Sequence, residues 1–172
     1  FILHELMHKF VAQHYGAIAG FRTSTTGLLV TLATGAFGFL LGIPGATMIY
    51  TNYFSKRQNG IVSLAGPMTN FIVFGVFLAI GIIFGNSLGG YLQLAVSFTL
   101  FISIFLAFFN MLPIYPLDGS KVLAWNKEIY MATMGVIFAL MVLFTGISII
   151  EIAYFVIIAL FFSMFFRAGS MF

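Results

Sequence analysis

Long apolar runs separated by short polar turns dominate the pattern of this chain. Runs of about 20 apolar residues are long enough to cross the hydrocarbon core of a bilayer as helices. Four such runs predict transmembrane helices, at 61–85, 91–112, 128–146 and 149–167. The first two are joined by a tight turn at 86–90, and the last two meet in a very short turn near Gly146.

Two further segments precede these runs. Residues 1–19 contain no Pro and predict a helix, and the chain begins within this pattern, so we expect it to lack at least one upstream segment. Residues 20–60 are apolar but rich in Gly, Thr and Pro, which disfavours a helix and favours extended backbone. We expect short strands or a hairpin that dips into the membrane edge, packed against protein or a wet cavity. A Gly-rich transmembrane helix over 27–51 is the alternative.

The composition supports a membrane protein. Hydrophobic residues make up 62% of the 172 positions and charged residues 6%, whereas a soluble domain carries about a quarter charged residues. So few charges could not cover the surface of a soluble fold. The predicted fold class is an all-α polytopic membrane protein with one domain over 1–172. It is a bundle of transmembrane helices with a small membrane-associated extended or β-hairpin element after the first helix, and the lipid bilayer is its expected partner.

The charges indicate an orientation. The net charge is +3, but no dense basic patch exists to bind a phosphate backbone, so no nucleic-acid partner is expected. The turns at 86–90 and 146–148 carry no Lys or Arg. If 20–60 does not cross the membrane, the opposite face collects Arg22, Lys56, Arg57, Lys121, Lys127 and Arg167. The positive-inside tendency makes that face cytoplasmic.

The first candidate chemistry is the opening sequence His4-Glu5-Leu6-Met7-His8. Residues four apart on a helix share a face, so two imidazoles at this spacing can reach a single zinc ion. Glu5 lies beside them, where it can act as general base on a zinc-bound water. Polar side chains in an apolar helix are costly and mark function. The alternative is an ordinary helix face with satisfied histidines.

A third ligand is needed, because catalytic zinc usually takes three protein ligands and a water. The chain has only four acidic residues. Asp118 stands in the segment 113–124, where Pro113 and Pro116 open the backbone at the end of an apolar span. This position favours Asp118 as the third ligand, and a helix N-cap is its alternative role. The chain has no Cys, so no cysteine-based metal site or nucleophile is possible.

These motifs occur together in a known order. His4-Glu5-x-x-His8, followed about a hundred residues later by Asn110-x-x-Pro-x-x-Pro-Leu-Asp118-Gly, resembles the site-2 protease family of intramembrane zinc metalloproteases. The segment Gly66-x-x-x-Asn70 is similar to a motif at the start of that family's middle core helix. The stretch at 42–46 is similar to the membrane-dipping loop of the archaeal type. The family commonly continues Asp-Gly-Gly-Arg, whereas this chain reads Asp-Gly-Ser-Lys, which keeps the charge.

The resemblance implies a role for each matching residue. His4, His8 and Asp118 would bind one Zn²⁺ per chain, and Glu5 would activate the water. Asn110 would be catalytic and would help to hold substrate or the oxyanion. Asn70 would contact substrate, with interhelical packing beside Gly66 as its alternative.

The function that the resemblance implies is zinc-dependent hydrolysis of peptide bonds in transmembrane protein substrates, that is, regulated intramembrane proteolysis. The protein would be a multi-pass protein of a prokaryotic, archaeal-like cell membrane, without a PDZ or CBS-like domain in this chain. Its active site would open toward the cytoplasm. Two other classes remain open: a transporter or channel with an intramembrane ion path, and an inactive scaffold for membrane partners.

Overall fold

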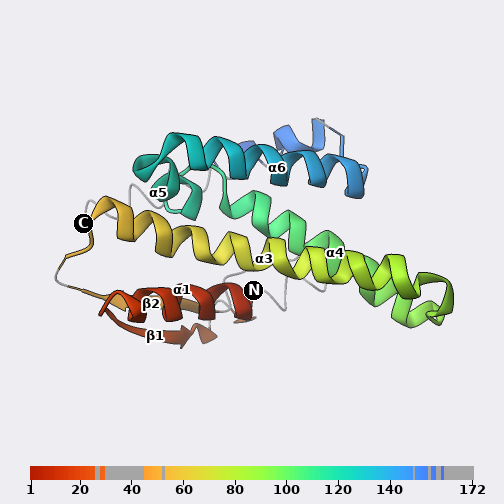
Figure 1. Cartoon of the computed structure of the whole chain (residues 1–172), viewed down its shortest axis with the longest axis horizontal. Helices are drawn as coiled ribbons and strands as arrows, with labels where there is room; N and C mark the ends of the chain where they lie inside the picture. The colour runs from red at the N-terminus through yellow and green to blue at the C-terminus, as the bar shows by residue number, and fades with distance from the viewer. Residues whose placement is uncertain are drawn as a thin grey trace.

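The computed structural model describes residues 1–25, 28–29, 45–51, 53–148, 150–154, 156–157 and 160. These residues are mainly helical and include a two-stranded antiparallel sheet, shown in Figure 1. A mainly helical chain with a small hairpin after the first helix agrees with the predicted fold class. Most of the alternative helix over 27–51 lies outside the described residues.

The first helix is shorter than predicted. Helix α1 (Ile2–His14) ends five residues before the limit expected from the sequence. Gly16 follows with a φ of +81°, the left-handed conformation in which Gly commonly ends a helix. Strand β1 (Ile18–Thr23) then pairs antiparallel with β2 (Gly45–Tyr50). Extended structure therefore begins inside the range predicted to be helical.

Helix α3 (Lys56–Phe84) begins five residues before the predicted span at 61–85. Its start is fixed by a capping box: the hydroxyl of Ser55 accepts from the N–H of Gln58, and the Gln58 side chain accepts from the N–H of Ser55. This cap satisfies two backbone donors that the helix leaves free. The extended segment predicted to reach residue 60 therefore ends at Ser55.

The remaining described helices follow the predicted order. A short turn, η1 (Gly85–Ser87), connects α3 to α4 (Gly90–Asn110), which ends two residues before the predicted limit. The loop with the two prolines leads into α5 (Asp118–Trp125), and α6 (Lys127–Thr145) follows. The predicted helix at 149–167 falls largely outside the described residues.

Helix α3 lies at the centre of the arrangement and packs against α1, α4 and α5. Figure 1 shows α1 and the hairpin on one side of α3 and α6 on the other. The largest fully buried side chains include Phe74 of α3, Ile104 and Phe108 of α4, and Ile137 and Met141 of α6. This core fixes α3 and α4 relative to α6 and includes Val122 of α5, the helix that begins at Asp118.

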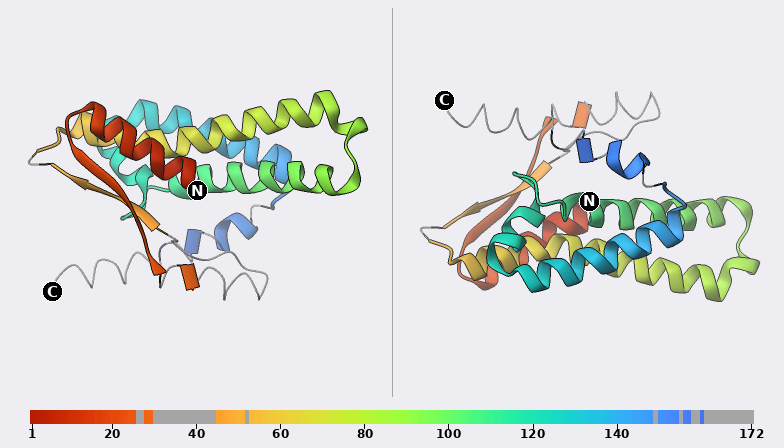
Figure 2. Two further views of the ribbon diagram at one scale, coloured as in Figure 1. Left: turned by 90° about the horizontal axis from the view of Figure 1, so that it is seen from below. Right: turned by 90° about the horizontal axis from the view of Figure 1, so that it is seen from above.

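Three helices among the described residues are long and apolar enough to cross a membrane: Lys56–Ser87, Gly90–Asn110 and Lys127–Thr145. Large apolar side chains such as Ile82, Leu92 and Leu143 are exposed on them, as expected for surfaces that lipid covers. Both views in Figure 2 place the start of α3, helix α5 and the start of α6 at the same end of the bundle.

Candidate metal centre

The two histidines of α1 lie one turn apart and face α3. Nδ1 of His8 donates a hydrogen bond of 2.7 Å to the carbonyl of Val62, and Nδ1 of His4 lies 3.0 Å from Nδ2 of Asn70. The later histidine thus meets the earlier part of α3, so the two helices run antiparallel here. Both rings are buried.

Gly66 lies between these two contacts and makes room for the rings. A Cβ atom at this position would fall 2.5 Å from Nε2 of His4, and closer still to Nε2 of His8. Carbon atoms in ordinary contact stay about 3.5–4.0 Å from their neighbours. The missing side chain at Gly66 therefore allows the two rings to approach the backbone of α3.

The third side chain comes from α5. Its N-cap is Leu117, and Asp118 is its first residue, so the N-cap role considered for Asp118 belongs to its neighbour. Gly119 allows the start of α5 to lie against the preceding loop, since a Cβ atom there would overlap the carbonyl of Met111. This close packing brings the Asp118 carboxylate to the two histidines.

Three potential ligand atoms converge in this way. The two Nε2 atoms of His4 and His8 are 3.0 Å apart. Oδ2 of Asp118 lies 3.3 Å from Nε2 of His4 and 3.1 Å from Nε2 of His8. All three residues are buried, and among the described residues they form the group of His, Asp and Glu side chains that could hold a metal ion.

The spacing of these atoms fits zinc. Zinc bonds to imidazole nitrogen and carboxylate oxygen are about 2.0–2.2 Å long, so tetrahedral ligands should lie roughly 3.3–3.5 Å from one another. Two of the observed separations, 3.0 and 3.1 Å, fall just below this range, and the third, 3.3 Å, lies at its lower limit. The cluster therefore needs only a small expansion. Two imidazoles and a carboxylate also match the donor set of catalytic zinc sites, which keep a fourth position open. The hydrogen bond from His8 to Val62 holds that ring with Nε2 free to bind.

The carboxylate of Asp118 is in the form that binds a metal. Asp118 lies in α5, outside the three apolar spans. Burial raises its pKa, but hydrogen bonds from His4 and His8 and the positive charges of His8 and Lys121 hold the pKa below its usual range. Nζ of Lys121 lies 3.6 Å from Oδ1 of Asp118. One carboxylate oxygen thus faces the histidines, and the other faces a cation.

Glu5 is held by the hairpin. Its Oε2 accepts a 2.7 Å hydrogen bond from the backbone N–H of Thr47, and the Thr47 hydroxyl donates to the backbone carbonyl of Glu5 at 2.6 Å. Thr47 lies on β2 opposite Phe21, and its N–H points away from β1. Thr47 was not predicted as a site residue, because the Thr-rich composition of its segment is the only signal in the sequence that points to it.

The other polar residues noted in the sequence occupy different positions. Asn70 is buried against His4. Asn110 is half-buried at the end of α4, where its amide donates to the carbonyl of Leu106. Contact of either amide with substrate stays a prediction. His14 is exposed beside Tyr15 and takes no part in the cluster.

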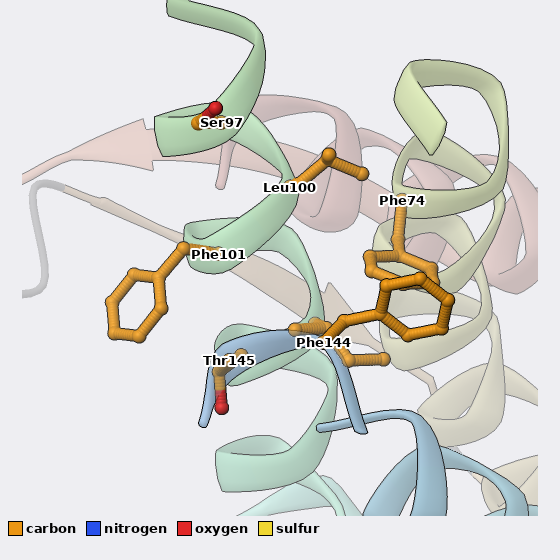
Figure 3. A pocket seen from close by; sticks show the side chains of 7 residues that line it. Phe74, Ser97, Leu100, Phe101, Phe144 and Thr145 are labelled. Carbon is orange, nitrogen blue, oxygen red and sulfur yellow. The ribbon is translucent and has the colours of Figure 1, made fainter. Parts of the chain in front are cut away.

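An apolar pocket of about 130 Å³ lies apart from this cluster, among α3, α4 and the end of α6 (Figure 3). Its lining side chains include Phe74, Leu100, Phe101 and Phe144. None of the three clustered residues lines it, and its lining contains no His, Asp or Glu.

The chain is similar to several zinc metalloproteases. It is 44% identical over 131 residues to MJ0611 of Methanocaldococcus jannaschii, a protein provisionally named a zinc metalloprotease, across 76% of this chain and 68% of that protein. It is 28% identical to zinc metalloprotease MJ0392 of the same organism, across 71% of this chain and 30% of that protein.

A bacterial relative carries the same provisional name. Rip2 of Mycolicibacterium smegmatis is 30% identical over 132 residues, across 68% of this chain and 50% of that protein. No protein-family model matches the chain, and no solved structure matches it. The chain thus spans about two thirds of the first relative and half or less of the other two.

Proposed function

Because the chain belongs to the family of zinc metalloproteases that includes these relatives, we propose that it is an intramembrane endopeptidase of the site-2 protease type. One zinc ion per chain would be held by His4, His8 and Asp118. The observation that carries the proposal is the convergence of three ligand atoms from α1 and α5, all within 4.8 Å of one another and all buried.

The position of the cluster along α3 supports a site below the membrane surface. Gly66 touches both histidines and follows Lys56, the first residue of α3, by ten residues. At helical rise this distance is about 15 Å, and the hydrocarbon core of a bilayer is about 30 Å thick. If the basic start of α3 lies at the surface, the ligands lie well inside the apolar layer. Such depth suits cleavage of a transmembrane segment.

Each residue of the site has a role in peptide hydrolysis. When bound, zinc polarises the scissile carbonyl and lowers the pKa of the attacking water to near 7. Glu5 takes the proton of that water and delivers it to the leaving amine. The hydrogen bond from the N–H of Thr47 fixes the direction of the Glu5 carboxylate. Asn110 donates to the developing oxyanion, and Asn70 and Asn110 lie on the proposed substrate path.

The hairpin offers a way to bind an unwound substrate. A transmembrane helix hides its amides in its own hydrogen bonds, so it must open before cleavage. The Thr47 N–H lies on the edge of β2 that β1 does not pair, and this edge faces α1 and Glu5. A substrate strand could add to this edge and so bring its backbone to the metal site.

The orientation follows from the basic end of the bundle. Lys56 and Arg57 at the start of α3, Lys121 in α5 and Lys127 at the start of α6 lie at this end. By the positive-inside tendency we propose that it faces the cytoplasm and that water reaches the site from there. A prokaryotic, archaeal-like cell membrane is the proposed location.

The test uses the purified protein reconstituted in liposomes with two reporters: a single-span membrane peptide with a Gly-rich centre, and a soluble unfolded protein. Zinc is counted by elemental analysis. We expect about one zinc per chain, lost in His4→Ala, and cleavage of the membrane reporter. Glu5→Gln should keep the zinc and lose cleavage.

Two outcomes would contradict parts of this proposal. Equal cleavage by wild type and Glu5→Gln would refute the enzymatic mechanism. Cleavage of the soluble reporter alone would leave a metalloprotease but refute cleavage within the membrane.

A further inference from the structure

Asn70 is a buried polar residue beside the site, and the mechanism gives it only a place on the proposed substrate path. Its side chain is 4% exposed, and it lies one helical turn after Gly66, on the face of α3 that meets α1. Its Nδ2 is 3.0 Å from Nδ1 of His4, on the side of the ring that faces away from Asp118. Asn70 therefore contacts His4, a proposed zinc ligand, at the ring nitrogen that does not bind the metal.

The two histidines have different partners at Nδ1. His8 meets the carbonyl of Val62, which can only accept, so Nδ1 of His8 carries a hydrogen. Oδ2 of Asp118 also only accepts, and it lies 3.3 Å from Nε2 of His4. The hydrogen of a neutral His4 ring therefore sits on Nε2, and its Nδ1 accepts from the amide of Asn70.

Zinc binding would move the hydrogen of His4 from Nε2 to Nδ1, whereas the hydrogen on Nδ1 of His8 would stay in place. When both Nε2 atoms bind a cation, each gives its lone pair, and the hydrogen of His4 has to sit on Nδ1. The group behind His4 must then accept rather than donate. A carboxamide can do both, because rotation by 180° about its terminal bond exchanges the oxygen and the nitrogen without a change of shape.

We propose that Asn70 is the positioning residue of His4, and that its amide reverses when zinc binds so that Oδ1 accepts from Nδ1–H of the ring. This inference rests on the proposed zinc site. His8 is fixed in the ligand tautomer by a backbone carbonyl, whereas His4 is adaptable because its partner is an amide. Groups that orient metal-binding histidines commonly change metal affinity by 10- to 100-fold.

The substitutions at Asn70 separate this role from packing. Asn70→Asp keeps the shape and always accepts, so it supports the metal-bound tautomer alone. Asn70→Leu keeps the volume and offers neither donor nor acceptor. The matched control is Thr69→Val, because Thr69 is also buried on α3 and its hydroxyl bonds only to the Ala65 carbonyl among the described contacts.

The experiment measures zinc affinity of the reconstituted protein by competition with a chelator. We expect Asn70→Leu to bind zinc about 10- to 100-fold more weakly, Asn70→Asp to bind at least as tightly as wild type, and Thr69→Val to stay within about two-fold of wild type. Equal affinity of wild type and Asn70→Leu would overturn the inference, and so would an Asn70→Asp variant as weak as Asn70→Leu.

A second measurement needs no variant that could fail to fold. With ¹⁵N-labelled histidine, zinc addition to the wild type should move the His4 hydrogen from Nε2 to Nδ1 and leave that of His8 on Nδ1. A His4 hydrogen that stays on Nε2 in the zinc-bound protein would overturn the inference. A wild type that binds no zinc at all would instead refute the proposed function, so the two failures are distinguishable.

Discussion

The substitution Gly66→Ala should weaken zinc binding strongly while leaving the fold intact. The added Cβ atom would lie 2.5 Å from Nε2 of His4, 2.6 Å from its Cε1, and closer still to Nε2 of His8. An ordinary contact requires about 3.5 Å, so the rings must move by about 1 Å. Metal–ligand distances tolerate a change of only about 0.2 Å. We expect zinc affinity to fall by at least about 100-fold.

The effect on stability should be much smaller. Forcing an extra methyl group into a packed site costs about 1–3 kcal/mol, and helical Ala recovers part of this cost relative to Gly. Gly75→Ala is the matched control, because it makes the same change on the same helix with nothing within 4 Å of the new Cβ atom. Zinc affinity is measured by chelator competition and helix content by circular dichroism. A folded Gly66→Ala variant that binds zinc as tightly as Gly75→Ala would refute this reasoning.

Two other predictions test the contacts that position Glu5 and Asp118. Thr47→Pro removes the N–H that bonds to Glu5 but no bond to β1, so it should slow cleavage about 10- to 100-fold with zinc content unchanged. Thr47→Val keeps that N–H and should slow cleavage only about two- to three-fold in the same assay; equal rates for the two variants would contradict the role of the bond. Gly119→Ala would clash with the Met111 carbonyl and should lower both zinc content and thermal stability. Gly135→Ala, which meets open space, should change neither, and identical behaviour of the two variants would rule out the close approach at Gly119.

The sequence predicted the parts of the fold that depend on local pattern. The long apolar runs predicted the helices that became α3, α4 and α6, because length and hydropathy are local properties. The end of α1 at His14 was missed although Gly16 is a local signal for a helix end. Strand β1, which follows it, pairs with residues more than 20 positions away, and this pairing is not a local property. The register of the hairpin could not be read because polar and apolar side chains do not separate between the two faces: Arg22 and Thr23 lie on opposite faces of β1.

Some residues of the candidate site could likewise be predicted from the local sequence, and others could not. The spacing of His4 and His8 placed both rings on one helix face, and the few acidic residues of the chain left Asp118 as the third candidate. The structure brings these three together, and we propose that they bind the metal. The contacts of Thr47 with Glu5 and of Gly66 with the rings join residues more than 40 positions apart. Composition indicates nothing of such contacts, because they arise only when the helices pack.

X-ray absorption at the zinc edge, on the purified wild-type protein and on His8→Ala, tests the central claim most directly. We expect a shell with two imidazole nitrogens and at least one carboxylate oxygen at about 2.0–2.2 Å, and the loss of one imidazole in the variant. Absence of bound zinc in the folded wild type, or a shell that His8→Ala leaves unchanged, would contradict the account.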